Sequence, residues 1–154
     1  MEEIHWWNFP DYVYFELNNG TRKDLFSRFM ENKTFKKAAE ILNESAPEEY
    51  NLSAGDIHCW MTGFKKDEKC RIPKWALEEL CKATNFDRIS IEKSIITYKY
   101  SGRGIEIKPK LPITITPEFS SIFVHFLGDG HLGKDKCNYK QLNKENRENF
   151  LKNP

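Results

Sequence analysis

The residue whose type and setting point most directly to chemistry is Asp129, which stands between Gly128 and Gly130. A largely apolar stretch, residues 119–127, leads into it, and Pro117 stands in front of that stretch. This pattern predicts a helix that ends at the glycines. The helix dipole disfavours a carboxylate at that end by about 0.3–1 kcal/mol. A divalent cation would reverse this effect, so Asp129, with Gly128 beside it, is a candidate metal-binding position.

Four short helices are predicted upstream of this motif, and together they would form a small bundle. Each carries apolar residues at helical spacing. Thr21 with Asp24 has the spacing of a capping box, and Ser53 with Asp56 marks the start of the third helix. Gly63 would end that helix. The helices are expected over residues 21–32, 34–43, 53–63 and 72–84, with a lysine-containing loop over residues 64–70.

The second predicted helix contains Ala38-Ala39-Glu40-Ile41-Leu42, the third ends in Trp60-Met61-Thr62-Gly63, and the fourth begins at Ile72-Pro73. These features resemble the lambda-repressor-like helix-turn-helix family, in which the third helix lies in the DNA major groove. The resemblance implies that the residues facing DNA are Ser53, Ala54, Asp56, His58 and Cys59. It also implies that the residues near the DNA backbone are Lys65, Lys66, Lys69 and Arg71.

The bundle departs from that family in two ways. The link between the second and third helices, residues 44–52, is longer than the three- or four-residue turn of a helix-turn-helix. The outward face of the third helix carries no Arg, Gln or Asn, the usual readers of base edges. Two interpretations therefore stay open: a DNA-binding module, or a bundle that is structural or contacts another protein.

Strands are predicted on both sides of the bundle. Residues 12–17 favour a strand that ends at a turn over residues 18–20, and residues 89–98 are rich in β-forming side chains. A hairpin turn is expected over residues 101–104, and the strand over residues 12–17 would pair with this hairpin. Residues 88–110 hold six basic side chains against two acidic ones, a net charge of +4. Two interpretations stay open for Lys99, Arg103 and Lys108. Either they contact phosphates, or they are solvated side chains that protect a sheet edge from aggregation.

The N-terminal aromatic side chains favour packing over base stacking. These are Trp6, Trp7, Phe9, Tyr12 and Tyr14.

Composition restricts the function classes. The chain has 154 residues, with 24 basic and 23 acidic side chains and a formal net charge of +1. A nucleic-acid surface would therefore require local segregation of charge. No apolar run is long enough to span a membrane and no signal peptide is evident, so we expect a cytoplasmic location. The four cysteines, Cys59, Cys70, Cys81 and Cys137, are expected to be reduced thiols. We expect no zinc, because no closely spaced cysteine pair occurs.

The motif Phe126-Leu127-Gly128-Asp129-Gly130-His131-Leu132 resembles that of LAGLIDADG homing endonucleases, in its archaeal and intein-associated form. The resemblance implies that Asp129 is the catalytic acid and holds magnesium during phosphodiester hydrolysis. It also implies a homodimer through the helix from Phe119 to Leu127. The residues of that helix contact would be Phe123, Val124 and Leu127, with Val124 where the family usually has glycine. Residues 117–154 would cover only the first third of the family's αββαββα unit.

The sequence thus predicts an α+β protein with four segments. They are an aromatic segment over residues 1–20, a helix-turn-helix-like domain over 21–86, a basic hairpin and connector over 87–116, and a partial LAGLIDADG-like helix-strand-helix segment over 117–154. The first functional hypothesis is a protein that binds double-stranded DNA without cleaving it. The second is an active magnesium-dependent homing endonuclease when dimeric or full length. The third is a helix-turn-helix transcriptional regulator with the apolar C-terminal helix as its dimer seam.

Overall fold

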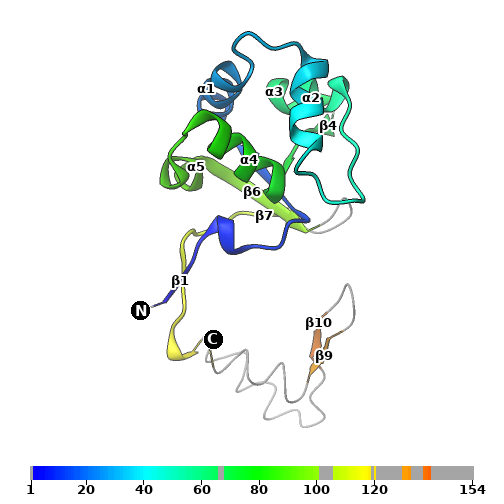
Figure 1. Ribbon diagram of the computed structural model, residues 1–154. Coiled ribbons are helices and arrows are strands. Elements are labelled where there is room, and N and C mark those ends of the chain that lie inside the picture. The colour runs from blue at the N-terminus through cyan, green and yellow to red at the C-terminus, as the bar shows by residue number, and fades with distance from the viewer. Residues whose placement is uncertain are drawn as a thin grey trace. The chain divides into compact units, whose positions relative to one another are not determined.

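The structure is a computed structural model, and it describes residues 2–65, 68–100, 106–118, 120, 130–132 and 137–139 (Figure 1). The chain forms two compact units, one made of Ile4–Pro112 and the other of Met1–Glu3 with Ile113–Pro154. The described residues mix helices with antiparallel sheets, which confirms the α+β class. Among these residues, no helix is both long and apolar enough to cross a bilayer.

A four-stranded sheet in the order β5-β2-β6-β7 supports the larger unit. Its strands are β2 (Val13–Leu17), β5 (Ile72–Pro73), β6 (Ile95–Tyr100) and β7 (Glu106–Ile107), and each pairs antiparallel with its neighbours. Side chains alternate along β2, so that Val13, Phe15 and Leu17 are buried while Tyr14 and Glu16 are half-buried. This alternation places one face of the sheet against the core.

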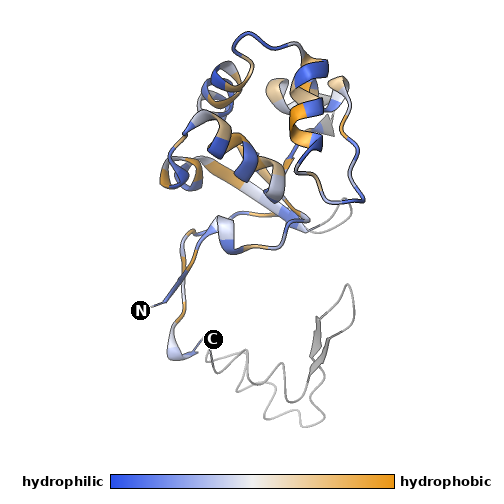
Figure 2. Ribbon diagram, viewed as in Figure 1, coloured by the Kyte–Doolittle hydropathy of each residue, from blue (hydrophilic) through white to orange (hydrophobic). Residues whose placement is uncertain are grey.

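Helices cover that core, and each carries both hydrophobic and hydrophilic residues (Figure 2). They are α1 (Asn19–Phe29), α2 (Phe35–Asn43), α3 (Ala54–Thr62), α4 (Lys74–Thr84) and α5 (Arg88–Ser94), with a 3-10 turn η1 (Trp6–Asn8). The apolar side chains form one continuous cluster with those of β2, in which Phe26, Ile57, Leu77 and Ile91 are fully buried. Burial of this apolar area is the main stabilising term for such a unit.

The core also takes up the N-terminal aromatic residues. Trp6 is fully buried, and its indole N–H donates to the Arg88 carbonyl at 3.0 Å. Trp7 and Phe9 pack against the same cluster, whereas Tyr12 is exposed and meets Tyr100 edge-on. The predicted packing of the aromatic segment is therefore confirmed for three of these rings.

Several predicted elements are confirmed. The helix predicted over residues 34–43 is α2, whose N-cap Thr34 accepts from the Lys37 backbone N–H. The third predicted helix is α3, and it ends at Gly63 in the left-handed conformation. The N-terminal strand is β2, and it pairs with β6, which in turn pairs with β7 as the hairpin prediction requires.

The prediction of β structure from residue 89 onward is wrong over its first half, because residues 88–94 form α5. Asp87 caps this helix, since its carboxylate accepts from the Ser90 backbone N–H at 2.8 Å. Ile91 is fully buried on the inner face of α5. Capping and burial thus outweigh the weak β preference of the isoleucines in this stretch.

Three further local features differ from prediction. The cap of α1 is Asn18, whose side chain accepts from the Thr21 N–H at 2.9 Å, and not the Thr21–Asp24 box. Ile72–Pro73 belongs to β5 rather than to the fourth helix, because it pairs with Phe15 and Tyr14. The expected loop over residues 64–70 contains the strand pair β3 (Phe64–Lys65) and β4 (Glu68–Lys69).

The smaller unit contributes two short strand pairings. β1 (Glu3–Ile4) pairs with β8 (Ile113–Thr114), and the Ile115 N–H donates to the Glu2 carbonyl at 2.9 Å. β9 (Gly130–Leu132) pairs antiparallel with β10 (Cys137–Tyr139). Pro117 and Glu118 are helical, as predicted for the start of the apolar helix.

Candidate nucleic-acid interface

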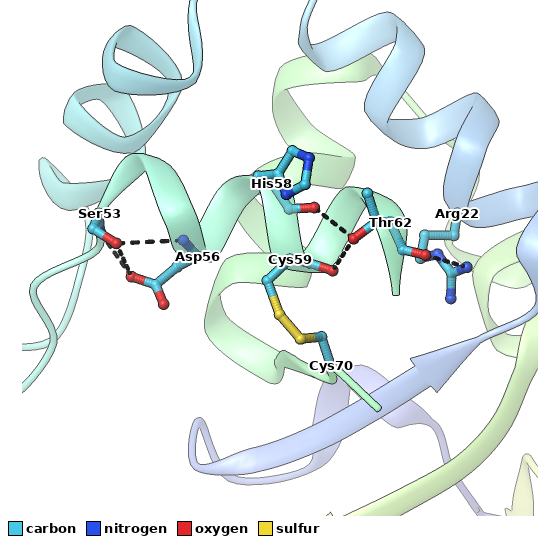
Figure 3. The surroundings of a disulfide bond; sticks show 7 residues. All are labelled: Arg22, Ser53, Asp56, His58, Cys59, Thr62 and Cys70. Atoms are coloured by element: carbon cyan, nitrogen blue, oxygen red, sulfur yellow. Dashed lines mark hydrogen bonds between the residues drawn. A yellow bond between two sulfur atoms is a disulfide. The ribbon is translucent and has the colours of Figure 1, made fainter. Parts of the chain in front are cut away.

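The start of α3 is fixed by a reciprocal cap. The Ser53 hydroxyl oxygen accepts from the Asp56 N–H, while the Asp56 carboxylate accepts from the Ser53 N–H at 2.8 Å and from its hydroxyl at 2.6 Å (Figure 3). Ser53 and Asp56, two of the residues predicted to face DNA, are thus hydrogen-bonded to each other. Asp56 also places negative charge in the first turn, where it favours the helix but opposes a phosphate.

The link between α2 and α3 is closed at its ends. The Asn43 side-chain amide donates to the Leu52 carbonyl at 3.0 Å and accepts from the Leu52 N–H at 2.8 Å. Tyr50, in the middle of the link, shares a hydrogen bond with the Tyr14 hydroxyl and packs its ring against Trp75. Although the link is longer than a helix-turn-helix turn, these contacts hold the two helices as a fixed pair.

The N-terminal half of α3 presents a small exposed face. Ala54, Gly55 and His58 are exposed, and the His58 ring meets the Phe35 ring of α2 edge-on at 5.4 Å. Cys59 is only 7% exposed, so the expectation that its side chain faces DNA is wrong. The exposed face of α3 therefore adjoins the beginning of α2.

Cys59 forms a disulfide with Cys70, with 5.9 Å between their Cα atoms (Figure 3). The expectation that both are reduced thiols is therefore wrong. Cysteine spacing does not reveal this pairing. It depends on the β3–β4 strand pair and on a hydrogen bond from the Cys70 N–H to the Gly63 carbonyl, which fold the segment back onto α3. Cys81 is a buried free thiol.

The basic residues that follow α3 lie against carboxylates of the sheet. Lys69 pairs with Glu16 at 3.1 Å, and Arg71 pairs with Glu106. Lys99 stands directly opposite Glu106 in the β6–β7 register. These side chains thus gather around two acidic residues instead of at the exposed face of α3, and their positive charge is locally offset.

The other predicted site residues are distributed as follows. Lys108 is exposed just after β7, and the backbone of Lys65 belongs to β3. The predicted residues that lie outside the described part of the chain are Lys66, Arg103, Phe123, Val124, Leu127, Gly128 and Asp129. Within the described part, no three His, Cys, Asp or Glu side chains gather closely enough to hold a metal ion.

The prediction of DNA-facing residues overlooked Lys36 and Lys37. Both are exposed in the first turn of α2, next to the Phe35 ring that meets His58. That first turn holds no acidic residue. The signal in the sequence was the placement of two lysines just after a capping threonine, where the helix dipole disfavours cations. Lys37 pairs with Glu40 at 3.3 Å, but an exposed pair of this kind is weak.

Comparison of the chain with protein-family models, with curated proteins and with solved structures finds no match in any of the three.

Proposed function

We propose that the larger unit binds double-stranded DNA, with the N-terminal half of α3 in the groove and the start of α2 on the phosphate backbone. The observation that carries this proposal is the adjacency of two exposed features. His58 on α3 contacts Phe35 on α2, so the lysines of the first turn of α2 border the exposed face of α3. In helix-turn-helix proteins the same two surfaces share the contacts to the duplex.

Electrostatics at the start of α2 support a phosphate contact. The backbone N–H groups of a helix N-terminus attract an anion, and Lys36 and Lys37 add two positive charges there. No acidic residue of that first turn competes with a phosphate. The unfavourable placement of these lysines in the free protein would become favourable once a phosphate is bound.

The chemistry of the exposed face predicts modest sequence selectivity. Ala54 and Gly55 offer apolar or backbone contacts, and His58 is the exposed polar ring among the residues of this face. Arg, Asn and Gln, which make bidentate contacts to bases, are missing from α3. The affinity should therefore depend mainly on phosphate contacts, with small differences between duplex sequences.

A fluorescence anisotropy titration of short duplexes tests this proposal. We expect binding at low salt that the Lys36→Glu/Lys37→Glu double variant loses, because it reverses both charges beside α3. The matched control is Lys93→Glu, which reverses an exposed lysine on α5. Absence of binding by the unmodified protein, or equal losses in both variants, would refute the α2–α3 interface.

A second candidate function is magnesium-dependent cleavage of DNA by a LAGLIDADG-type site at Asp129. The β9–β10 strand pair begins at Gly130, directly after Asp129, and that family's unit likewise places strands after the helix that carries the acid. The N-terminal start of the expected helix is also helical at Pro117 and Glu118. Asp129 and Gly128 would hold the metal, which would offset phosphate charge.

Incubation of supercoiled plasmid with magnesium tests the second candidate. We expect any nicking by the unmodified chain to disappear in the Asp129→Asn variant, which removes the charge that would bind the metal. Nicking that persists in this variant would place the activity elsewhere. No nicking by either protein would leave DNA binding as the function of this chain.

A further inference from the structure

A shallow cleft of about 390 Å³ lies where the end of β2, the start of α1 and the end of α3 meet. It is lined by Glu16, Leu17, Asn19, Arg22, Lys23, Thr62 and Ile96. All of these residues belong to the larger unit. The cleft lies at the C-terminal end of α3, whereas the proposed DNA-binding face lies at the opposite end of the same helix.

Arg22 is the unusual residue of this cleft, because it is a cation that is only 8% exposed and no carboxylate of the described residues is hydrogen-bonded to it. Its Nη2 donates to the neutral Asn19 side-chain oxygen at 2.9 Å. The same nitrogen donates to the Thr62 carbonyl at 3.2 Å (Figure 3). Its Nε is buried and has no hydrogen-bond partner in the described part of the chain. A buried donor left unpaired is costly, so the guanidinium retains unused capacity for an acceptor.

The packing around Arg22 fixes where its guanidinium lies. Gly63 has φ of 85°, and a Cβ added there would lie 2.3 Å from the guanidinium carbon. Glycine at this position therefore permits both the left-handed end of α3 and the close approach of Arg22. The charged group is pre-positioned at the cleft by the backbone and does not depend on a flexible surface side chain.

The charges around the cleft leave a positive surplus. Glu16 is the carboxylate that acts electrostatically on Arg22. Its charge is already shared, because it pairs with Lys69 at 3.1 Å and accepts from the Thr97 hydroxyl at 2.9 Å. Lys23 is exposed beside Arg22 and makes no ion pair with the described residues. Burial lowers the pKa of Arg22, against the opposing effect of Glu16, so an added anion would also favour its charged form.

We propose that this cleft is a phosphate-binding site, in which Arg22 supplies directed N–H donors and Lys23 a second positive charge. A tetrahedral dianion suits two neighbouring cations, and guanidinium groups bind phosphate oxygens in a bidentate manner. Leu17 and Ile96 provide an apolar wall, which would accept the carbon body of a phosphate monoester. The site is separate from the proposed DNA-binding face, and it stands if that proposal fails.

Isothermal titration with inorganic phosphate, against chloride at matched ionic strength, tests the site. We expect saturable one-to-one binding, weakened about tenfold or more in Lys23→Ala and in Arg22→Met. Lys23 is exposed, so its variant keeps the fold even if Arg22→Met does not. Lys93→Ala serves as the control and should bind phosphate like the unmodified protein. Backbone amide resonances of Thr62, Gly63 and Asn19 should shift on titration.

The outcomes separate a ligand site from a structural arginine. If phosphate does not bind, or if Lys23→Ala binds it as well as the unmodified protein does, the proposal is wrong and Arg22 only caps α3. A duplex of DNA added to the phosphate complex identifies the source of the phosphate. Displacement of phosphate by the duplex supports a backbone phosphate as the occupant, and retention supports a free phosphate or a monoester.

Discussion

At the scale of single residues, polar and titratable groups are fixed by burial and by local caps. Glu92 is 6% exposed, and its carboxylate accepts from the Trp6 N–H at 3.1 Å and contacts the His5 ring at 3.0 Å. The His5 ring in turn stacks on Trp7. This cluster ties the N-terminal segment to α5 through buried hydrogen bonds, which a buried carboxylate requires.

Cys81 should contribute a pH dependence to stability. Burial raises the pKa of its thiol from 9.0 to about 12, so between these values the folded state keeps a proton that the unfolded state has lost. The free energy of unfolding should therefore fall as pH rises through this window, by about 1.4 kcal/mol per pH unit from this group. Below the window the contribution is fully present.

Urea unfolding of the unmodified protein and of Cys81→Ala, from neutral pH into this window, measures that contribution. Other groups that titrate there are common to both proteins, so the difference between the two slopes isolates the thiol. We expect the free energy of unfolding to fall less steeply with pH in Cys81→Ala than in the unmodified protein. Parallel slopes would show that Cys81 titrates alike in the folded and unfolded states.

Ser53 should matter to stability through its cap. Its hydroxyl and backbone N–H both take part in the reciprocal bonds with Asp56 at the start of α3. Replacement of such a cap by alanine costs about 0.5–2 kcal/mol. We expect Ser53→Ala to lower the free energy of unfolding by that amount in denaturant titrations. Ser27→Ala, at an exposed position within α1, is the control and should be nearly neutral. Equal effects of the two substitutions would contradict the role of the cap.

At the scale of elements, the helices predicted best are those whose ends carry local signals. Thr34 at the start of α2 and Gly63 at the end of α3 act within a few residues of the chain, so sequence spacing reveals them. The extent of α5 depends on burial of Ile91 against distant segments, and β5 exists only through its pairing with β2. Such long-range effects leave no local pattern.

The disulfide is the clearest element-scale constraint, because it joins α3 to the segment that leads into β5. A cross-link of this size contributes about 2–4 kcal/mol, chiefly by restricting the unfolded chain. We expect a reductant to lower the free energy of unfolding by that amount. The Cys59→Ser/Cys70→Ser variant should show the lower stability from the outset and no response to reductant. If a reductant still lowers the free energy of unfolding of this variant, the effect belongs to another group and not to the disulfide.

At the scale of the whole molecule, charge distribution decides how the candidate interface can work. The net charge is +1, and Lys69 and Arg71 are offset by Glu16 and Glu106, so these basic residues after α3 are less available to phosphates than the sequence predicts. Sequence reasoning located α3, but two of the basic residues that it chose, Lys69 and Arg71, pair with carboxylates of the sheet. It omitted Lys36 and Lys37, because only the packing of α2 on α3 places them beside His58.

The central claim is that phosphates are bound at the start of α2 beside α3, and the salt dependence of DNA affinity tests it most directly. For duplex DNA, the slope of log K against log salt changes by about 0.9 for each phosphate contact. We expect Lys36→Glu/Lys37→Glu to reduce the magnitude of this slope by about two such contacts, roughly 1.8, relative to the unmodified protein. Lys93→Glu should leave the slope unchanged. An unchanged slope in the double variant, or an equal reduction in Lys93→Glu, would contradict the assignment of the interface to α2 and α3.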